Sequence, residues 1–104
     1  MHLTARADVP TATPERYAKQ LVAHLGRKVA FSDVESDAGT GSMAEIGDAR
    51  GTVVPGDGVL VLLAEAPDEA GLARVQDVLG RHLERFGQRQ ELVVEWVRPT
   101  VVAS

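Results

Sequence analysis

The stretch VLVLLAEAPDEAGLARVQDVLGRHLERF, residues 59–86, carries the two strongest structural signals in the chain. Residues 59–66 are apolar on both faces, which is typical of a central strand covered on both sides. Pro67-Asp68 predicts a helix start, and Gly87 predicts the helix end. The residues expected in the buried stripe of this helix are Leu72, Val75, Val78, Leu79, His82, Leu83 and Phe86. A covered strand followed by an amphipathic helix predicts mixed α and β structure.

The first 26 residues predict another strand and helix. Residues 2–9 alternate between apolar and polar side chains, as in a half-buried strand. Thr13 followed by Pro14 indicates a helix start, and Gly26 is a natural stop. One face of this helix is apolar and is expected to pack on the sheet; it carries Tyr17, Ala18, Leu21, Val22 and Leu25.

The patterns in the remaining segments are weaker. A strand is expected around residues 29–33, and the polar, small residues 35–42 are interpreted as a mobile loop. Two short strands are expected at 43–46 and 51–54, but the pattern leaves the strand order and register in 43–58 open. Alternation in residues 92–97 predicts a last strand. The predicted order is β-α-β-β-β-β-α-β, an α+β domain over residues 1–99 with two helices on one face of a mainly antiparallel sheet and a short tail, 100–104.

Composition limits the classes of partner. The 104 residues are 44% apolar and 25% charged, which is ordinary for one globular domain. A net charge of −4 disfavours nucleic acid, and the lack of cysteine excludes disulfides and thiolate metal sites. The longest apolar run, residues 59–64, is too short to span a bilayer, and the N-terminus has no signal-peptide pattern. We therefore expect a cytoplasmic protein with no membrane or nucleic-acid partner.

The common catalytic and cofactor motifs are not found in the sequence. It has no complete phosphate-binding loop, no G-x-S-x-G, no H-E-x-x-H and no acidic calcium loop. Gly39-Thr-Gly-Ser42 comes nearest to a phosphate loop, but the lysine that should follow is missing, so we interpret it as a hairpin tip. No cofactor is expected, and the catalytic residues, if the chain is an enzyme, are unknown.

Two histidines are the most informative polar residues. Helical spacing places His82 in the apolar stripe, where its ring nitrogens need partners: a core carbonyl or carboxylate, or a ligand. His24 lies on the shoulder of the first helix, facing either water or the other helix. If both converged with Glu65 or Glu95, they would form a two-histidine, one-carboxylate metal set, but the sequence does not determine these distances.

Three separated blocks of sequence resemble one bacterial family. Residues 16–29 (RYAKQLVAHLGRKV), 81–86 (RHLERF) and 92–96 (LVVEW) are similar to domain of unknown function 2218, and the likeness spans nearly the whole chain. The resemblance implies a small, free-standing bacterial protein with no established activity, substrate or cofactor. The sequence departs from the family pattern at Arg27, where members carry a second histidine, and at Val53, where they carry cysteine. A metal site that used either position would be absent here.

Three hypotheses for function follow. The first is a non-catalytic binding or accessory protein, a homodimer through an apolar sheet face made of Val59, Val61, Leu63, Val93 and Val97. The second is a metal or small-ligand site between helices and sheet, with His24 and His82 at its centre and Tyr17 and Trp96 as walls. The third, an enzyme with a histidine general base, is favoured least because no nucleophile accompanies the histidines.

Overall fold

Strands and helices follow one another along the chain in nearly the predicted order. The computed structural model describes residues 3–36, 38–88 and 92–98. In this part of the chain the elements are β1 (Leu3–Pro10), α1 (Pro14–Leu25), β2 (Phe31–Ser36), β3 (Gly39–Ile46), β4 (Ala49–Pro55), β5 (Val59–Ala66) and α2 (Glu69–Phe86). The predicted α+β class is confirmed, and so is the order of elements up to the second helix. The residues assigned to the tail, 100–104, lie outside the described part.

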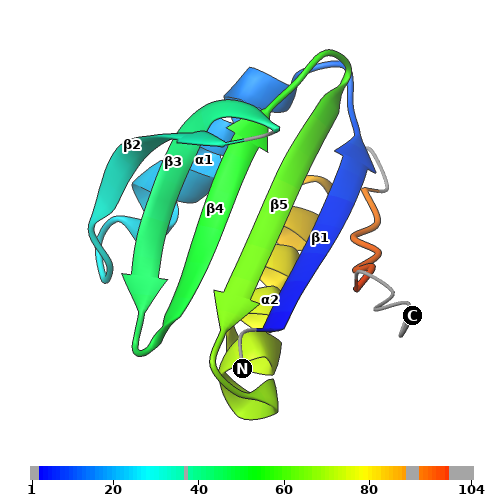
Figure 1. Cartoon of the computed structure of the whole chain (residues 1–104). Helices are drawn as coiled ribbons and strands as arrows, with labels where there is room; N and C mark the ends of the chain where they lie inside the picture. The colour runs from blue at the N-terminus through cyan, green and yellow to red at the C-terminus, as the bar shows by residue number, and fades with distance from the viewer. Residues whose placement is uncertain (1–2, 37, 89–91, 99–104) are drawn as a thin grey trace.

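The sheet is antiparallel, with the strand order β1-β5-β4-β3-β2. Figure 1 shows both helices behind this sheet, α1 behind β3 and β4 and α2 behind β5 and β1. The predicted placement of both helices on one face is therefore confirmed. β5 lies at the second position from one edge, and α2 covers the face of β5 that carries Leu60, Leu62 and Ala64.

A row of small residues positions α2. The register brings Ala5 opposite Ala64, and Ala64 opposite Gly51. A Cβ on Gly51 would lie 3.1 Å from Leu79 Cδ1 and 3.2 Å from a methyl group of Val75. Because the sheet carries so little bulk along this row, the apolar face of α2 packs close to the backbone of β4.

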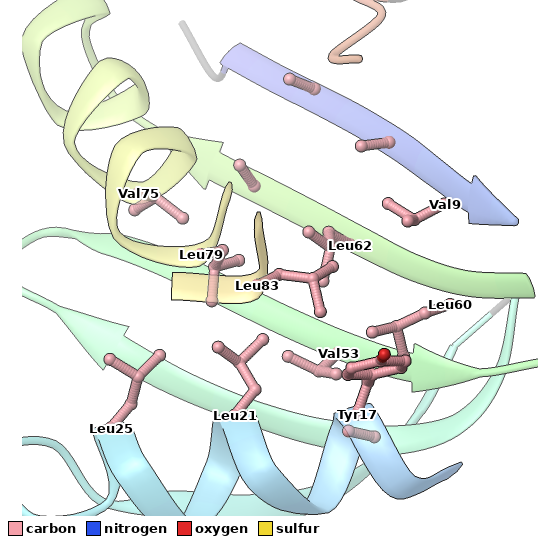
Figure 2. Close-up of a cluster of buried hydrophobic side chains, with 14 of the residues drawn as sticks. Val9, Tyr17, Leu21, Leu25, Val53, Leu60, Leu62, Val75, Leu79 and Leu83 are labelled. Carbon is pink, nitrogen blue, oxygen red and sulfur yellow. The ribbon is translucent and has the colours of Figure 1, made fainter. Parts of the chain in front are cut away.

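The core lies between the sheet and the helices. Figure 2 shows leucine and valine side chains from α1, α2 and β5 pointing toward one another. Leu21, Leu62 and Leu79 are fully buried in this cluster. At the start of α2, the Asp68 carboxylate accepts a hydrogen bond of 2.7 Å from the Gly71 N–H, which is the expected N-cap.

The predicted stripe of α2 is too wide. Its fully buried apolar side chains are Leu72, Val75, Leu79 and Leu83, whereas Val78, His82 and Phe86 are partly exposed. Val78, His82 and Phe86 face α1 instead of the sheet, and α1 covers them only in part. His82 is therefore not in the core, which corrects the sequence prediction.

The predicted mobile loop at 35–42 is wrong, because most of these residues belong to a hairpin. Ser36 pairs with Gly39, and β3 continues from there to Ile46. The Ser36 hydroxyl donates to the Gly39 carbonyl at 2.9 Å and accepts from the Ala38 N–H at 3.2 Å. Gly39 has a φ of 126°, which favours glycine at this turn. Strand pairing in this hairpin comes from backbone hydrogen bonds, so small polar side chains do not prevent it.

The five apolar residues proposed as a dimer face do not form one surface. Val61 is 3% exposed, whereas Val93 and Val97 are 59% and 66% exposed and lie outside the named strands. The β2–β3 hairpin tip covers part of the outer sheet face: a Cβ on Gly39 would lie 3.5 Å from Val54 Cγ1. Figure 1 shows this tip in front of the end of β4. The chain thus covers part of its own second sheet face.

The C-terminal segment, residues 92–98, replaces the predicted last strand. Arg6 and Val97 exchange two backbone hydrogen bonds, of 2.9 and 2.7 Å, and form an isolated bridge. Extending this antiparallel register would place Glu95 opposite Asp8, where two negative charges repel each other. The segment instead runs along α2, and the expected strand is reduced to one bridge.

Candidate functional site

His24 and His82 converge, which the sequence left open. His24 is in the last turn of α1, and His82 is in the C-terminal half of α2. Their ring centroids are 5.0 Å apart, with a tilt of 46° between the ring planes. We call these two residues the histidine pair. The pair lies between the two helices, and its His24 side is exposed.

The orientation of the His82 ring is determined by its own helix. His82 Nδ1 lies 2.6 Å from the carbonyl oxygen of Val78, one turn earlier. A carbonyl can only accept, so Nδ1 carries the proton and donates it. The lone pair of the neutral ring is therefore on Nε2. Metal-binding histidines commonly use the same arrangement, with one nitrogen bonded to a carbonyl and the other available to the ligand.

The Phe86 ring packs against the imidazole of His24. Its centroid is 5.3 Å from that of His24, and the two planes meet edge to face at 82°. Phe86 is one helical turn beyond His82, so the two side chains share one face of α2. The His24 ring thus contacts two residues of α2 from the end of α1.

The electrostatic environment of His24 is cationic. Desolvation lowers the pKa of His24 below 6.5, and positive charge on His82, Arg27, Arg85 and Lys28 lowers it further. A lowered pKa keeps the His24 ring neutral at pH 7, with one nitrogen free of a proton. Sequence reasoning missed these three permanent cations. Their spacing was a usable signal, because they follow the histidines by three or four residues.

Tyr17 and Trp96 do not line this site. Tyr17 is 6% exposed, and its ring lies beside Leu60 and Val53 in the core, as Figure 2 shows. Trp96 packs against α2 at Gly80: a Cβ on Gly80 would lie 3.2 Å from the indole Nε1. Positions 80 and 82 are about 200° apart around a helix, so Trp96 is on the flank of α2 away from His82.

The proposed third metal ligand is also elsewhere. Glu65 lies between Ala64 and Ala66, which face the helices, so its side chain is on the opposite sheet face. Together with Glu95 it lines a cleft of about 790 Å³ formed by β1, β5 and the C-terminal segment. Among the described residues, no group of three or more His, Cys, Asp or Glu could hold a metal ion. The set of two histidines with Glu65 or Glu95 is therefore not formed.

Two clefts away from the histidines offer weaker sites. The 790 Å³ cleft contains Arg6 and Asp8, which already pair with each other at 2.7 Å. A second cleft of about 450 Å³, between α1 and the β3–β4 region, is lined in part by Thr40 and Ser42. These two residues are in the β2–β3 ladder, so their backbone does not form a phosphate-binding loop.

The fold defines an α+β protein of ferredoxin-like type. One solved structure that resembles it is the solution NMR structure of the de novo designed protein LFR1 1 with ferredoxin fold. It has 12% identity and a TM-score of 0.53, and the match covers 100% of this chain and 89% of that one. The NMR structure of PA4090 from Pseudomonas aeruginosa is also similar, with 24% identity and a TM-score of 0.70, over 91% of this chain and 95% of that one. At these identities the likeness concerns the fold alone.

Residues 6–97 match the family described as "Uncharacterized protein conserved in bacteria (DUF2218)". The chain belongs to this family, which confirms the resemblance seen in the sequence. No curated protein matches the chain. The family has no described function, so the function of this chain has to be inferred from its own residues.

Proposed function

We propose that this chain is a non-catalytic binding protein whose ligand site is the histidine pair. The observation that carries the proposal is the 5.0 Å separation of the two rings, with His82 Nδ1 bonded to the Val78 carbonyl. Desolvation and the neighbouring positive charges disfavour protonation of His24, as its lowered pKa shows. Such an arrangement costs stability below neutral pH, and groups with unfavourable electrostatics are concentrated at functional sites. A ligand that contacts both rings would explain why they meet.

The surroundings of the pair favour binding over catalysis. A histidine general base is normally oriented by a carboxylate and placed next to a nucleophile. In the described part of the chain, no carboxylate is among the groups that shift the pKa of His24. The hydroxyls of Thr40 and Ser42 line a different cleft, and Tyr17 is in the core. An enzyme that uses His24 or His82 as a base is therefore supported less than a binding protein.

The proposal includes a cytoplasmic location and no nucleic-acid partner, for which the lack of cysteine and the net charge of −4 are the support. In the described part of the chain, neither helix has the length and apolar character needed to cross a membrane. Homodimerisation stays a separate prediction. Of the apolar residues proposed for a dimer face, Val97 and Leu63 lie together in the 790 Å³ cleft. Sedimentation at micromolar concentration tests whether the chain forms a dimer.

Native mass spectrometry tests the ligand site. The protein is measured as purified, then with Zn²⁺ and, separately, with inorganic phosphate. We expect one probe to add mass to the wild type and to the control His2→Ala, but not to His24→Ala or His82→Ala. Thermal unfolding shows whether the variants keep the fold. Equal binding of both probes by all four proteins would contradict the proposal.

A further inference from the structure

The ring spacing of the histidine pair fits two-point binding of a single metal ion. Zinc–nitrogen bonds are about 2.0–2.1 Å, and two imidazoles on one tetrahedral zinc have ring centroids about 5 Å apart. The observed separation is 5.0 Å. The separation of the two ring centres is therefore the one that a shared zinc ion requires.

We infer that the ligand of the histidine pair is a divalent transition-metal ion, held by one nitrogen of each imidazole. This inference rests on the proposed function and gives its ligand a chemical class. The tautomer of His82 supports it, since the bond from Nδ1 to the Val78 carbonyl leaves Nε2 as the nitrogen with a lone pair available to a metal ion. The backbone carbonyl thus acts as the outer partner that fixes the ring.

The number of ligands determines the character of the site. Structural zinc sites have four protein ligands and catalytic sites usually three, whereas the pair supplies two. The other positions on the ion are filled by water or a small co-ligand, so binding is reversible and depends on metal concentration. Imidazole suits Zn²⁺, Ni²⁺ and Cu²⁺, and the general order of affinity predicts the tightest binding for Cu²⁺.

The nearby cations provide a test that distinguishes a bound metal ion from a bound anion. Arg27, Lys28 and Arg85 act on His24 as positive charges and would also repel a bound dication. Removing one of them should strengthen metal binding by about twofold at moderate salt, because the charges are screened. The same change would weaken binding of an anion. Metal and anion are therefore distinguished by the direction of the effect.

The experiment is calorimetric titration of the full chain with Zn²⁺ and Cu²⁺. His24→Ala and His82→Ala should each weaken binding at least about tenfold. His2→Ala removes the remaining histidine, which lies outside the described residues, and should leave the affinity of the pair unchanged. Arg27→Gln and Arg85→Gln should each tighten binding. Electron paramagnetic resonance of the Cu²⁺ form should show nitrogen coordination that decreases in either histidine variant.

The outcomes separate the inference from the proposed function. If phosphate shifts the imidazole NMR signals of His24 and His82 while neither metal binds them, the metal inference is overturned and the binding site stands. Weaker metal binding in Arg27→Gln and Arg85→Gln would overturn it as well. If neither metal nor phosphate affects the pair, both the inference and the proposed function fail.

Discussion

The two flanks of α2 differ in how completely they are covered. The Gly80 flank, Gly80 and Glu84, is contacted by the C-terminal segment: Gly80 is buried next to Trp96 and Val94, and the exposed Glu84 carboxylate accepts from the Val94 N–H at 3.1 Å. The histidine flank, Val78, His82 and Phe86, faces α1 and stays partly exposed. One helix therefore has a closed side and an open side at similar positions along its length.

This difference separates structural from ligand-binding groups. On the Gly80 flank the absent side chain lets Trp96 and Val94 approach the helix backbone. On the histidine flank, His82 has one ring nitrogen bonded and lies next to the exposed His24. Substitutions on the first flank should change stability, and those on the second should change ligand binding.

The largest expected effect is that of Gly80→Leu, which breaks the closed flank. The new side chain would overlap Trp96 and Val94 and push the C-terminal segment away from α2. Overpacking of this kind costs about 1–3 kcal/mol, and we expect the upper part of that range. The chain has one tryptophan, so its emission should shift to the red in the folded variant. Ala70→Leu, at an exposed position of α2, is the control, and an unchanged spectrum in Gly80→Leu would contradict the packing.

Trp96→Ala should have a somewhat smaller effect on stability. Fully buried aromatic residues cost about 3–5 kcal/mol when cut to alanine, and Trp96 is partly buried, so we expect about 2 kcal/mol. Urea unfolding followed by circular dichroism measures the loss. Metal binding by this variant should match the wild type, because Trp96 is on the flank of α2 away from His82. A loss of metal binding without unfolding would place Trp96 in the site after all.

His82→Leu is the matched change on the open flank. The leucine keeps apolar contact with α1 and removes a partly exposed imidazole, so the free energy of unfolding should change by less than about 1 kcal/mol. Ligand binding should be lost. Chemical denaturation and calorimetry on one preparation check both points, and severe destabilisation would mean that the ring is chiefly structural.

The smallest effect concerns the ion pair that ties the C-terminal segment to the start of α2. Arg98 bonds both carboxylate oxygens of Glu69, at 2.8 and 2.5 Å, and the hydrogen bond holds the pKa of Glu69 below 4.5. The folded carboxylate thus releases its proton more readily than the unfolded one. Its contribution to stability is present above the unfolded pKa and lost as the pH falls through the lowered folded value.

Arg98→Gln should therefore be less stable than the wild type at neutral pH, and the difference should disappear at acid pH. Urea unfolding of both proteins between pH 7 and pH 3 measures it, and NMR titration should show the pKa of Glu69 returning toward its usual value. Because the pair is exposed, added salt should reduce the difference. A difference that persists at low pH would assign the effect to packing of the arginine side chain.

The elements that the sequence predicted correctly are those with a strong apolar periodicity. β5 and α2 combine long apolar patterns with clear end signals, and both form where expected. Residues 39–42 were interpreted as a hairpin tip, but strand pairing within 35–42 was not predicted, because it depends on backbone bonds between polar and glycine residues. The last strand was expected from alternation in residues 92–97, but this alternation reflects packing of every second residue toward α2.

The two histidines of the candidate site could be predicted from the sequence, but the distance between them could not. Helical spacing placed His82 on the apolar side of α2 and His24 on the shoulder of α1, and both are in the observed pair. Whether these side chains of α1 and α2 meet depends on the register of the sheet and on small residues such as Gly51, which set how closely a helix packs. Neither feature produces a recognisable pattern in the sequence. Tyr17 and Trp96 were chosen by residue type, which does not distinguish a core ring from a pocket wall.

The bridge between Arg6 and Val97 also protects the edge of the sheet. In β1, the backbone groups of Thr4 and Asp8 point the same way as those of Arg6, so an open β1 edge would offer a row of hydrogen-bonding groups to a strand of another molecule. The bridge occupies the middle of that row, and the charges of Asp8 and Glu95 discourage a neighbouring strand from extending it. By forming one pair and no more, the C-terminal segment makes this edge a poor template for aggregation.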